Sequence, residues 1–314
     1  MKRPFPFYIL GLTVLACSIF STPAVVPEGT VIIDPTEPLA TNTVVSIPIA
    51  VPALTADQLK NAAYQLVVKD SHPTVRLVNG VYKNGTDPFS TDYVSVRLAE
   101  PMAFGDLDGD GAGDAAVFLA ENYGGSGVFV SVIVMLNKNG QPVEAASELV
   151  DDRPNLNGIA IKDGQISLDV TVHGPNDPRC CAAQPNKRIY RYEAGRLVMT
   201  GLSMTTPDNH ERTITIDSPA DGADASWPLT VTGHFTIAPF ENNLIYSVFD
   251  INHNQVATGP LTVMAGQPGG PGTFSLPLDL RSMGVTGPLR IQVEDSSAAD
   301  GAILALASVK VNFK

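Results

Sequence analysis

Apolar and polar positions alternate with a period of two along most of the chain, which is the pattern of β-strands that bury one face. The main exception comes early. Between Leu59 and Val67, apolar residues recur at helical spacing behind Thr55, which suits the N-cap position of a helix. The sequence therefore predicts one short amphipathic helix over about Ala56 to Val67, followed by a chain built almost wholly of strands.

A first group of strand candidates follows that helix, separated by dipeptides that accept the backbone of tight hairpin turns. These turns are Asn79-Gly80, Asn139-Gly140, Asp163-Gly164 and Ala194-Gly195. The strand candidates are Val75–Val78, Val81–Tyr82, Tyr93–Ala99, Ala115–Ala120, Gly127–Leu136, Ile159–Lys162, Gln165–His173, Arg188–Glu193 and Leu197–Met199. We expect an antiparallel meander covered by the helix, an α+β domain over residues 54–204.

A second group of strand candidates begins after residues 205–212, a polar stretch that we interpret as a linker. Short strands with turns at regular spacing are typical of a β-sandwich. They are Thr213–Asp217, Leu229–Ile237, Leu244–Ile251, Val256–Val263, Thr273–Leu280, Leu289–Val293 and Ala305–Phe313. The fold class is therefore mainly β, with a β-sandwich over residues 213–314 as the second domain.

Particular motifs of this second domain resemble the immunoglobulin-like domain associated with bacterial spore germination proteins. They are Ile216-Asp217-Ser218-Pro219-Ala220-Asp221-Gly222, Leu229-Thr230-Val231-Thr232-Gly233, Phe240-Glu241-Asn242-Asn243-Leu244, Gly272-Thr273-Phe274 and Asp300-Gly301. The resemblance covers the last third of the chain and implies an extracellular module without known catalytic residues. The first domain resembles a segment of exported bacterial proteins of unknown function, and no activity follows from that.

The first residues look like an export signal. Lys2 and Arg3 precede an apolar stretch that is shorter than a membrane-spanning helix. Its end, Val14-Leu15-Ala16-Cys17, resembles a bacterial lipobox, which implies a signal peptide over residues 1–17 and lipidation of Cys17. Cleavage near Ala24 and an uncleaved anchor helix are the alternatives. Residues 18–53 are rich in Pro and Thr and predict an extended linker. We expect an exported protein, membrane-anchored on the extracytoplasmic side through its lipid.

Charge narrows the range of partners. The formal net charge is −12, and nucleic acid binding requires a basic surface instead. An acidic surface is compatible with divalent cations, although it can serve solubility alone. We therefore expect no nucleic acid partner, and an unknown envelope protein or polysaccharide in its place.

The run from Asp106 to Asp114 is the sharpest chemical signal. Carboxylates stand at its first, third, fifth and ninth positions, a glycine at the sixth and Ala112, with its backbone carbonyl, at the seventh. This spacing is typical of calcium loops, and the candidate ligands are Asp106, Asp108, Asp110, Ala112 and Asp114. Val117 replaces the bidentate glutamate of an EF-hand, so the run is more similar to the loops of integrin-type repeats, here in a single copy. Glu121 is a further candidate ligand, and an acidic turn without an ion is the alternative.

Two cysteines, Cys180 and Cys181, are adjacent in the loop that begins at Asp177. In an oxidising compartment they predict a vicinal disulfide that staples the loop. Buried reduced thiols, a redox role and a metal site that includes His173 remain alternatives.

Catalytic patterns are weak. Ser126 lies in a glycine-rich loop without the strand–turn–helix setting of a nucleophile elbow. His173 and Asp177 are close enough in sequence to form an acid–base pair. We expect a non-enzymatic cell-envelope lipoprotein with a binding or structural role, stabilised by calcium. The alternatives are an envelope hydrolase with a site near Ser126, His173 and Asp177, and an accessory subunit of an envelope complex.

Overall fold

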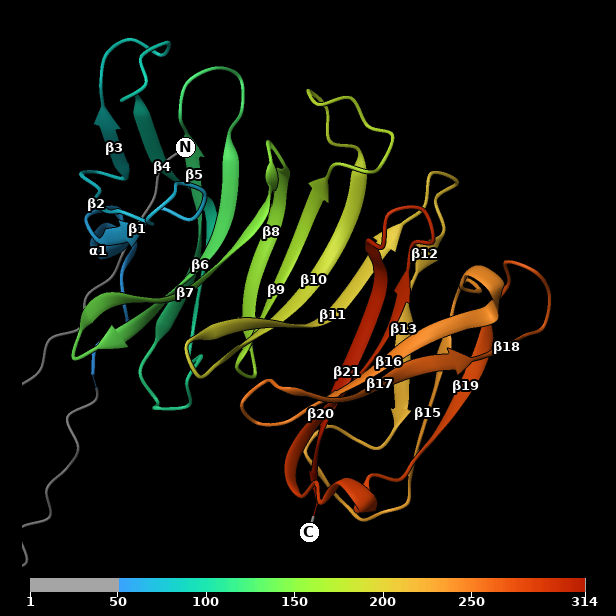
Figure 1. Cartoon of the computed structure of the whole chain (residues 1–314). Helices are drawn as coiled ribbons and strands as arrows, with labels where there is room; N and C mark the ends of the chain where they lie inside the picture. Colours follow the sequence, from blue (N-terminus) through green and yellow to red (C-terminus); the bar gives the residue numbers. More distant parts are fainter. Residues whose placement is uncertain (1–50, 314) are drawn as a thin grey trace, which may run out of the picture. The chain divides into compact units, whose positions relative to one another are not determined.

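Antiparallel strands dominate residues 51–313, the part of the chain that the computed structural model describes (Figure 1). The mainly β class expected from the sequence is confirmed. The expected signal peptide, Cys17 and all but the end of the 18–53 linker lie outside the described residues. Within residues 51–313, no helix is long and apolar enough to span a membrane.

A five-stranded antiparallel sheet forms the centre of the first domain, in the order β3-β4-β5-β6-β7. Both of its faces are buried. On β5, Ala116 and Phe118 belong to one apolar core, whereas Val117 and Leu119 belong to another on the opposite face. The strands are β3 (Val81–Asn84), β4 (Val94–Gly105), β5 (Asp114–Asn122), β6 (Phe129–Lys138) and β7 (Gln141–Asp152).

The cover on one face is smaller and less helical than the sequence predicts. Helix α1 spans only Ala56–Lys60, capped by Thr55 through a reciprocal capping box with Gln58. It is followed by the hairpin of β1 (Ala63–Gln65) and β2 (Thr74–Arg76). The expected helix to Val67 is therefore wrong beyond Lys60. The reason is visible in the burial, which alternates through Ala62, Tyr64 and Leu66 with the period of a strand.

The other face is covered by a second meander rather than by one continuous sheet. Its strands are β8 (Asn155–Lys162), β9 (Gln165–Val172), β10 (Gln184–Glu193) and β11 (Arg196–Thr205). Ile166, Leu168 and Val170 of β9 share a core with Phe118 and its neighbours on the five-stranded sheet. The first domain is therefore two stacked sheets, where the sequence predicted a single meander.

Strand β7 was not expected from the sequence. Its residues include acidic side chains, alanines and a proline, which are depleted in strands, and they show no clear alternation, so their pattern is not that of a strand. Pairing with β6 through the turn at Asn139 and Gly140 imposes the extended conformation. Both turn residues have positive φ, 56° and 82°, as a two-residue hairpin of this kind requires.

The second domain is the expected β-sandwich. One sheet has the order β13-β15-β19-β18, and the other includes β17-β16-β20-β21. Val231, Phe274 and Ile291 lie in the apolar core between them. The strands are β13 (Ile214–Ser218), β14 (Ala223–Ala225), β15 (Leu229–Phe235), β16 (Asn243–Phe249), β17 (Gln255–Thr262), β18 (Met264–Ala265), β19 (Gly272–Leu278), β20 (Gly287–Ser296) and β21 (Ile303–Phe313), with 3-10 turns η1 (Phe240–Asn242) and η2 (Arg281–Met283).

Residues 205–212, expected as a linker, carry structure of their own. The backbone N–H of Thr206 donates to the carbonyl of His210, and β12 (Glu211–Arg212) pairs with the end of β11. Gly201 and Leu202 of β11 also pair with β21, so one ten-stranded sheet includes strands from both sides of this segment.

Candidate metal centre

The acidic run forms the connection between β4 and β5. Strand β4 ends at Gly105 and β5 begins at Asp114, so the loop is Asp106–Gly113 with Asp114 as the first residue of the following strand. Leu107 is buried in the core shared by the two sheets of the first domain, which fixes the loop to the fold. The sequence folds here as a tight acidic turn between two strands.

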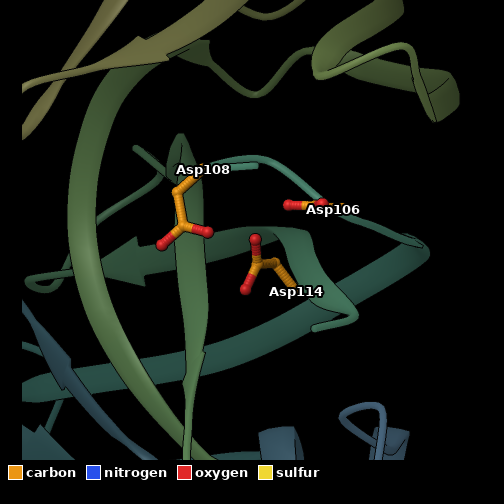
Figure 2. Close-up of side chains that lie close together, drawn as sticks. All are labelled: Asp106, Asp108 and Asp114. Carbon is orange, nitrogen blue, oxygen red and sulfur yellow. The ribbon is translucent and has the colours of Figure 1, made fainter. Parts of the chain in front are cut away.

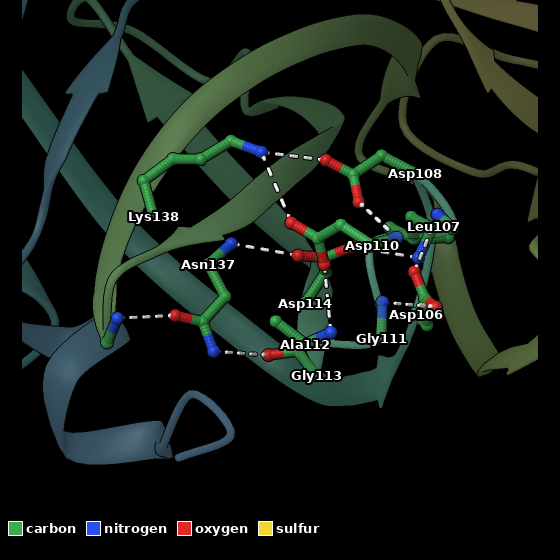
Figure 3. Close-up of polar contacts among 12 residues, drawn as sticks. Asp106, Leu107, Asp108, Asp110, Gly111, Ala112, Gly113, Asp114, Asn137 and Lys138 are labelled. Carbon is green, nitrogen blue, oxygen red and sulfur yellow. Dashed lines mark hydrogen bonds and ion pairs between the residues drawn. The ribbon is translucent and has the colours of Figure 1, made fainter. Parts of the chain in front are cut away.

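Backbone donors organise the carboxylates within the loop (Figure 3). Asp106 accepts from the N–H groups of Gly109 and Gly111, at 2.7 and 3.0 Å. Asp108 accepts from the N–H of Asp110, and Asp110 from that of Ala112. Gly109 and Gly111 have φ of 80° and 82°, which L-residues with side chains rarely adopt. The spacing of aspartates and glycines therefore has a direct conformational cause.

Three carboxylates converge. One oxygen from each of Asp106, Asp108 and Asp114 lies within 4.8 Å of the other two. Figure 2 shows these three side chains grouped beside the loop. Asp110 is not part of this group, although it belongs to the same loop. Three oxygens at this separation fit around one cation, and a divalent ion would relieve the repulsion among them. Calcium prefers six to eight oxygen ligands, so backbone carbonyls and water would have to supply the rest.

Asp114 also has a structural task. Its carboxylate is fully buried and accepts from the backbone N–H groups of Leu107 and Asn137, each at 2.8 Å. Burial raises the pKa of Asp114 above its usual range, against the lowering effect of these two donors. The Asn137 side chain donates in turn to the carbonyls of Pro52 and Gly113. Asp114 therefore connects the acidic loop to the end of β6.

A lysine already faces the same loop. The Lys138 Nζ lies 2.7 Å from an Asp108 oxygen and 3.6 Å from an Asp110 oxygen (Figure 3). Its hydrogen bond to Asp108 is the main reason that the pKa of Asp108 lies below its usual range. This ammonium group neutralises part of the acidic loop and would compete with a metal ion for Asp108. Lys138 could not be predicted as part of this site from the sequence, because it lies on β6, well away from the acidic run in sequence.

Two other sequence predictions for this site have clear outcomes. Val117 is fully buried in a strand core, so the loop does not continue into the second helix of an EF-hand. The expectation that Glu121 completes the ligand set is wrong, because Glu121 lies far from the acidic loop. It lies at the other end of β5 and accepts from the backbone N–H of Val67, at 2.9 Å, and from the Tyr123 hydroxyl.

The candidate catalytic residues do not form an acid–base pair. The His173 ring bonds through Nδ1 to Asp151, at 2.9 Å, and this contact raises the pKa of the imidazole. Asp177 instead accepts from the backbone N–H groups of Gly174 and Ala183. Among residues 51–313, no hydrogen bond connects Ser126 to either residue. Cys180 and Cys181 are joined in a disulfide at the tip of the same loop.

A site that the sequence did not suggest lies between β1 and β7. A cavity of about 620 Å³ is lined there by Gln65, Glu144 and Ser147, among others. Burial raises the pKa of Glu144 to about 7, and its carboxylate accepts from the backbone N–H of Gln65 at 2.7 Å. No sequence signal identifies Glu144, because β7 itself was not expected.

Comparison with known proteins gives one result. No curated protein matches the chain. A family model described as the immunoglobulin-like domain of bacterial spore germination matches residues 213–302, which contain the sandwich strands from β13 to β20. The resemblance expected from the motifs is confirmed for this part of the chain. Residues 213–302 are thus identified as an immunoglobulin-like domain of the kind found in bacterial spore germination, and the match covers this part of the chain alone.

Proposed function

We propose that the chain is a non-enzymatic cell-envelope lipoprotein that displays its immunoglobulin-like domain for binding or as a structural module. The observation that carries this proposal is the immunoglobulin-like domain at residues 213–302. Two features support it further: the lipobox-like Val14-Leu15-Ala16-Cys17, and a disulfide, which persists in oxidising compartments. His173 and Asp177 are engaged in contacts that hold a loop, so no described contact favours the hydrolase alternative.

The lipid anchor has a direct test. Cells that express the full chain and are fed a labelled fatty acid are expected to incorporate the label into the protein through Cys17. Cys17→Ser should remove the label and release the protein from the membrane fraction, because the acyl chains supply the membrane affinity. Cys180→Ser is the matched control and should keep both label and location. Label that persists in Cys17→Ser contradicts the anchor.

We further propose that the acidic loop binds calcium and stabilises the first domain. Support comes from the convergence of Asp106, Asp108 and Asp114, whose oxygens lie within 4.8 Å of one another. The loop is fixed at both ends, by buried Leu107 and by Asp114, so its carboxylates are organised before any ion arrives. Displacement of Lys138 from Asp108 is the cost of binding.

One end of the sandwich has the features of a contact surface, which we name the Phe240 surface: Phe240, Met264 and the adjacent hollow. Phe240 is 63% exposed and Met264 80%. The hollow, of about 410 Å³, is lined by the residues next to them in sequence: Ala238, Pro239, Glu241 and Asn242, and residues 265–269. Exposed aromatic and methionine side chains are enriched at binding interfaces.

The backbone at this surface supports the same conclusion. Glu241 and Asn242 are consecutive non-glycine residues with positive φ, 53° and 55°. Such conformations carry an energetic cost and concentrate at functional sites. The Asn242 carbonyl accepts from the N–H of Val263, which holds the two segments of the surface together. We infer that an envelope protein or polysaccharide contacts the chain here.

Binding at this surface is testable with purified full chain and isolated cell envelopes. Phe240→Ser is expected to reduce the retained protein by about tenfold, which corresponds to about 1.4 kcal/mol of binding energy for one aromatic anchor. Ile251→Ser is the matched control, because Ile251 is 67% exposed but lies beyond the other end of β16. Treatment of the envelopes with protease or with glycan hydrolases identifies the class of partner. Equal loss in both variants contradicts a role for the Phe240 surface.

A further inference from the structure

The loop between β9 and β10, which contains Cys180 and Cys181, is held in place by hydrogen bonds that do not involve the disulfide. One Asp177 oxygen accepts from the backbone N–H groups of Gly174 and Ala183, both at 2.8 Å, and these residues flank the loop. The N–H of Asp177 donates to the carbonyl of Gly174, and that of Cys181 to the carbonyl of Pro178. The loop therefore has a frame of hydrogen bonds at both its base and its tip.

The disulfide contributes little to this frame. A disulfide stabilises a fold mainly by closing a loop of the unfolded chain, and the gain grows with the number of residues enclosed. Cys180 and Cys181 are neighbours in sequence, so the bond between them encloses no further residue. The expected role as a loop staple is therefore not favoured by the contacts. A different reason for the bond has to lie in its chemistry.

The surroundings suit that chemistry. Cys180 and Cys181 are both exposed, as is Arg179 beside them. Both sulfurs are therefore accessible to an attacking thiolate, and access is one of the factors that set the rate of thiol–disulfide exchange.

We propose that Cys180–Cys181 is a thiol–disulfide exchange site that oxidises accessible thiols. An attacking thiolate forms a bond to one cysteine sulfur, the Cys180–Cys181 bond breaks, and its electron pair leaves on the other sulfur, which takes up a proton from water. A second thiol then attacks the mixed disulfide and releases an external disulfide. Two thiols are oxidised and the pair is reduced to two thiols, so electrons and protons balance. The proposal is independent of the lipid anchor and of calcium.

The experiment uses the folded full chain and two thiols, reduced glutathione and a short peptide with one reduced cysteine. After each time point, free thiols are alkylated and assigned by peptide mapping, which separates Cys180 and Cys181 from Cys17. Both cysteines are expected to react at a rate within about tenfold of that in denaturant, because an exposed disulfide gains little from unfolding. For each Cys180–Cys181 pair that is reduced, two external thiols should be oxidised. The near-ultraviolet circular dichroism spectrum of the chain should not change. Reaction with both thiols would indicate that protein thiols can be substrates. Reaction with glutathione alone would indicate that only small thiols are substrates.

Variants of the two cysteines and of Asp177 test whether the disulfide serves thiol–disulfide exchange or the stability of the fold. Cys181→Ser should accumulate a stable mixed disulfide on Cys180 when it is treated with oxidised glutathione, because no neighbouring thiol can displace the adduct. The double variant Cys180→Ser/Cys181→Ser should melt within about 2 °C of the unaltered chain, whereas Asp177→Ala should melt clearly lower. The proposal is overturned if the cysteines react only once the chain unfolds, or if the double variant melts several degrees lower.

Discussion

Millimolar calcium is expected to raise the melting temperature of the full chain by about 5–10 °C relative to excess chelator. An ion that binds only the native state at about 100 times its dissociation constant adds about 2.7 kcal/mol, and each kcal/mol shifts a domain of this size by about 2–4 °C. The gain comes from neutralising Asp106, Asp108 and Asp114, whose oxygens lie within 4.8 Å of one another. Thermal unfolding followed by circular dichroism measures it.

Three variants determine whether the acidic loop is responsible. Asp108→Ala should abolish the calcium-dependent shift, since Asp108 lies in the surface loop and belongs to no apolar core, so its carboxylate can be removed without harm to the core. Lys138→Gln should enlarge the shift, because the ammonium group that competes for Asp108 is removed. Asp114→Ala should lower the melting temperature with calcium and with chelator alike, because two buried backbone N–H groups lose their acceptor.

The opposite interpretation predicts a different pattern. If Lys138 alone neutralises the loop, calcium changes nothing and Lys138→Gln only destabilises the chain. Equal melting temperatures in chelator and in calcium, together with a lower value for Lys138→Gln, would therefore reject the calcium proposal.

The elements that could be predicted from the sequence are those with strong local signals. The hairpin turns at Asn79-Gly80, Asn139-Gly140, Asp163-Gly164 and Ala194-Gly195 all have positive φ at both residues, as the dipeptides indicate. Strands with one buried face, such as β9 and β19, alternate cleanly and were located within one or two residues. The local sequence was enough to predict these elements because tertiary contacts favour the same conformation.

The errors occur where tertiary contacts overrule local preference. Residues 61–67 have helical spacing, yet Ala63–Gln65 form strand β1, because they pair with β2 and Tyr64 packs against the five-stranded sheet. Strand β7 lacks the composition typical of a strand and is held in the extended conformation by pairing with β6. A hairpin turn at Asn139-Gly140 requires a strand on both sides, and that signal could have revealed β7.

The candidate site was predicted only as far as it is contiguous in sequence. The acidic loop was identified from its spacing, and three of its carboxylates converge. Asn137 and Lys138 were missed because strand pairing alone brings the end of β6 beside the loop. Glu121 was wrongly expected at the site because it follows Asp114 closely in sequence. The two residues lie near opposite ends of the extended strand β5, which keeps them far apart.

A second large effect is expected for Arg212, which lies in the segment 205–212 that the sequence predicts to be a linker. Its guanidinium forms an ion pair with Asp295 on β20, whose side chain is only 2% exposed. The other oxygen of Asp295 is buried and accepts no hydrogen bond in the described part of the chain. Arg212→Met should therefore lower the free energy of unfolding by about 3 kcal/mol, because the carboxylate loses its counter-charge while it stays buried. The corresponding fall in melting temperature is about 10 °C.

The pH dependence of the stability lost in Arg212→Met shows whether Arg212 acts through its charge or through its packing. Burial raises the pKa of Asp295, and Arg212 opposes the rise. Without Arg212 the folded-state pKa rises further above the unfolded value, so the folded state holds an extra proton between those two values and stability falls as pH increases through them. Denaturant unfolding at pH 5 and pH 8 should show the larger deficit at pH 8. The double variant Arg212→Met/Asp295→Leu should recover most of the loss at both values, because no unpaired charge remains. A deficit of equal size at pH 5 and pH 8 would show that Arg212 acts through the packing of its aliphatic stem.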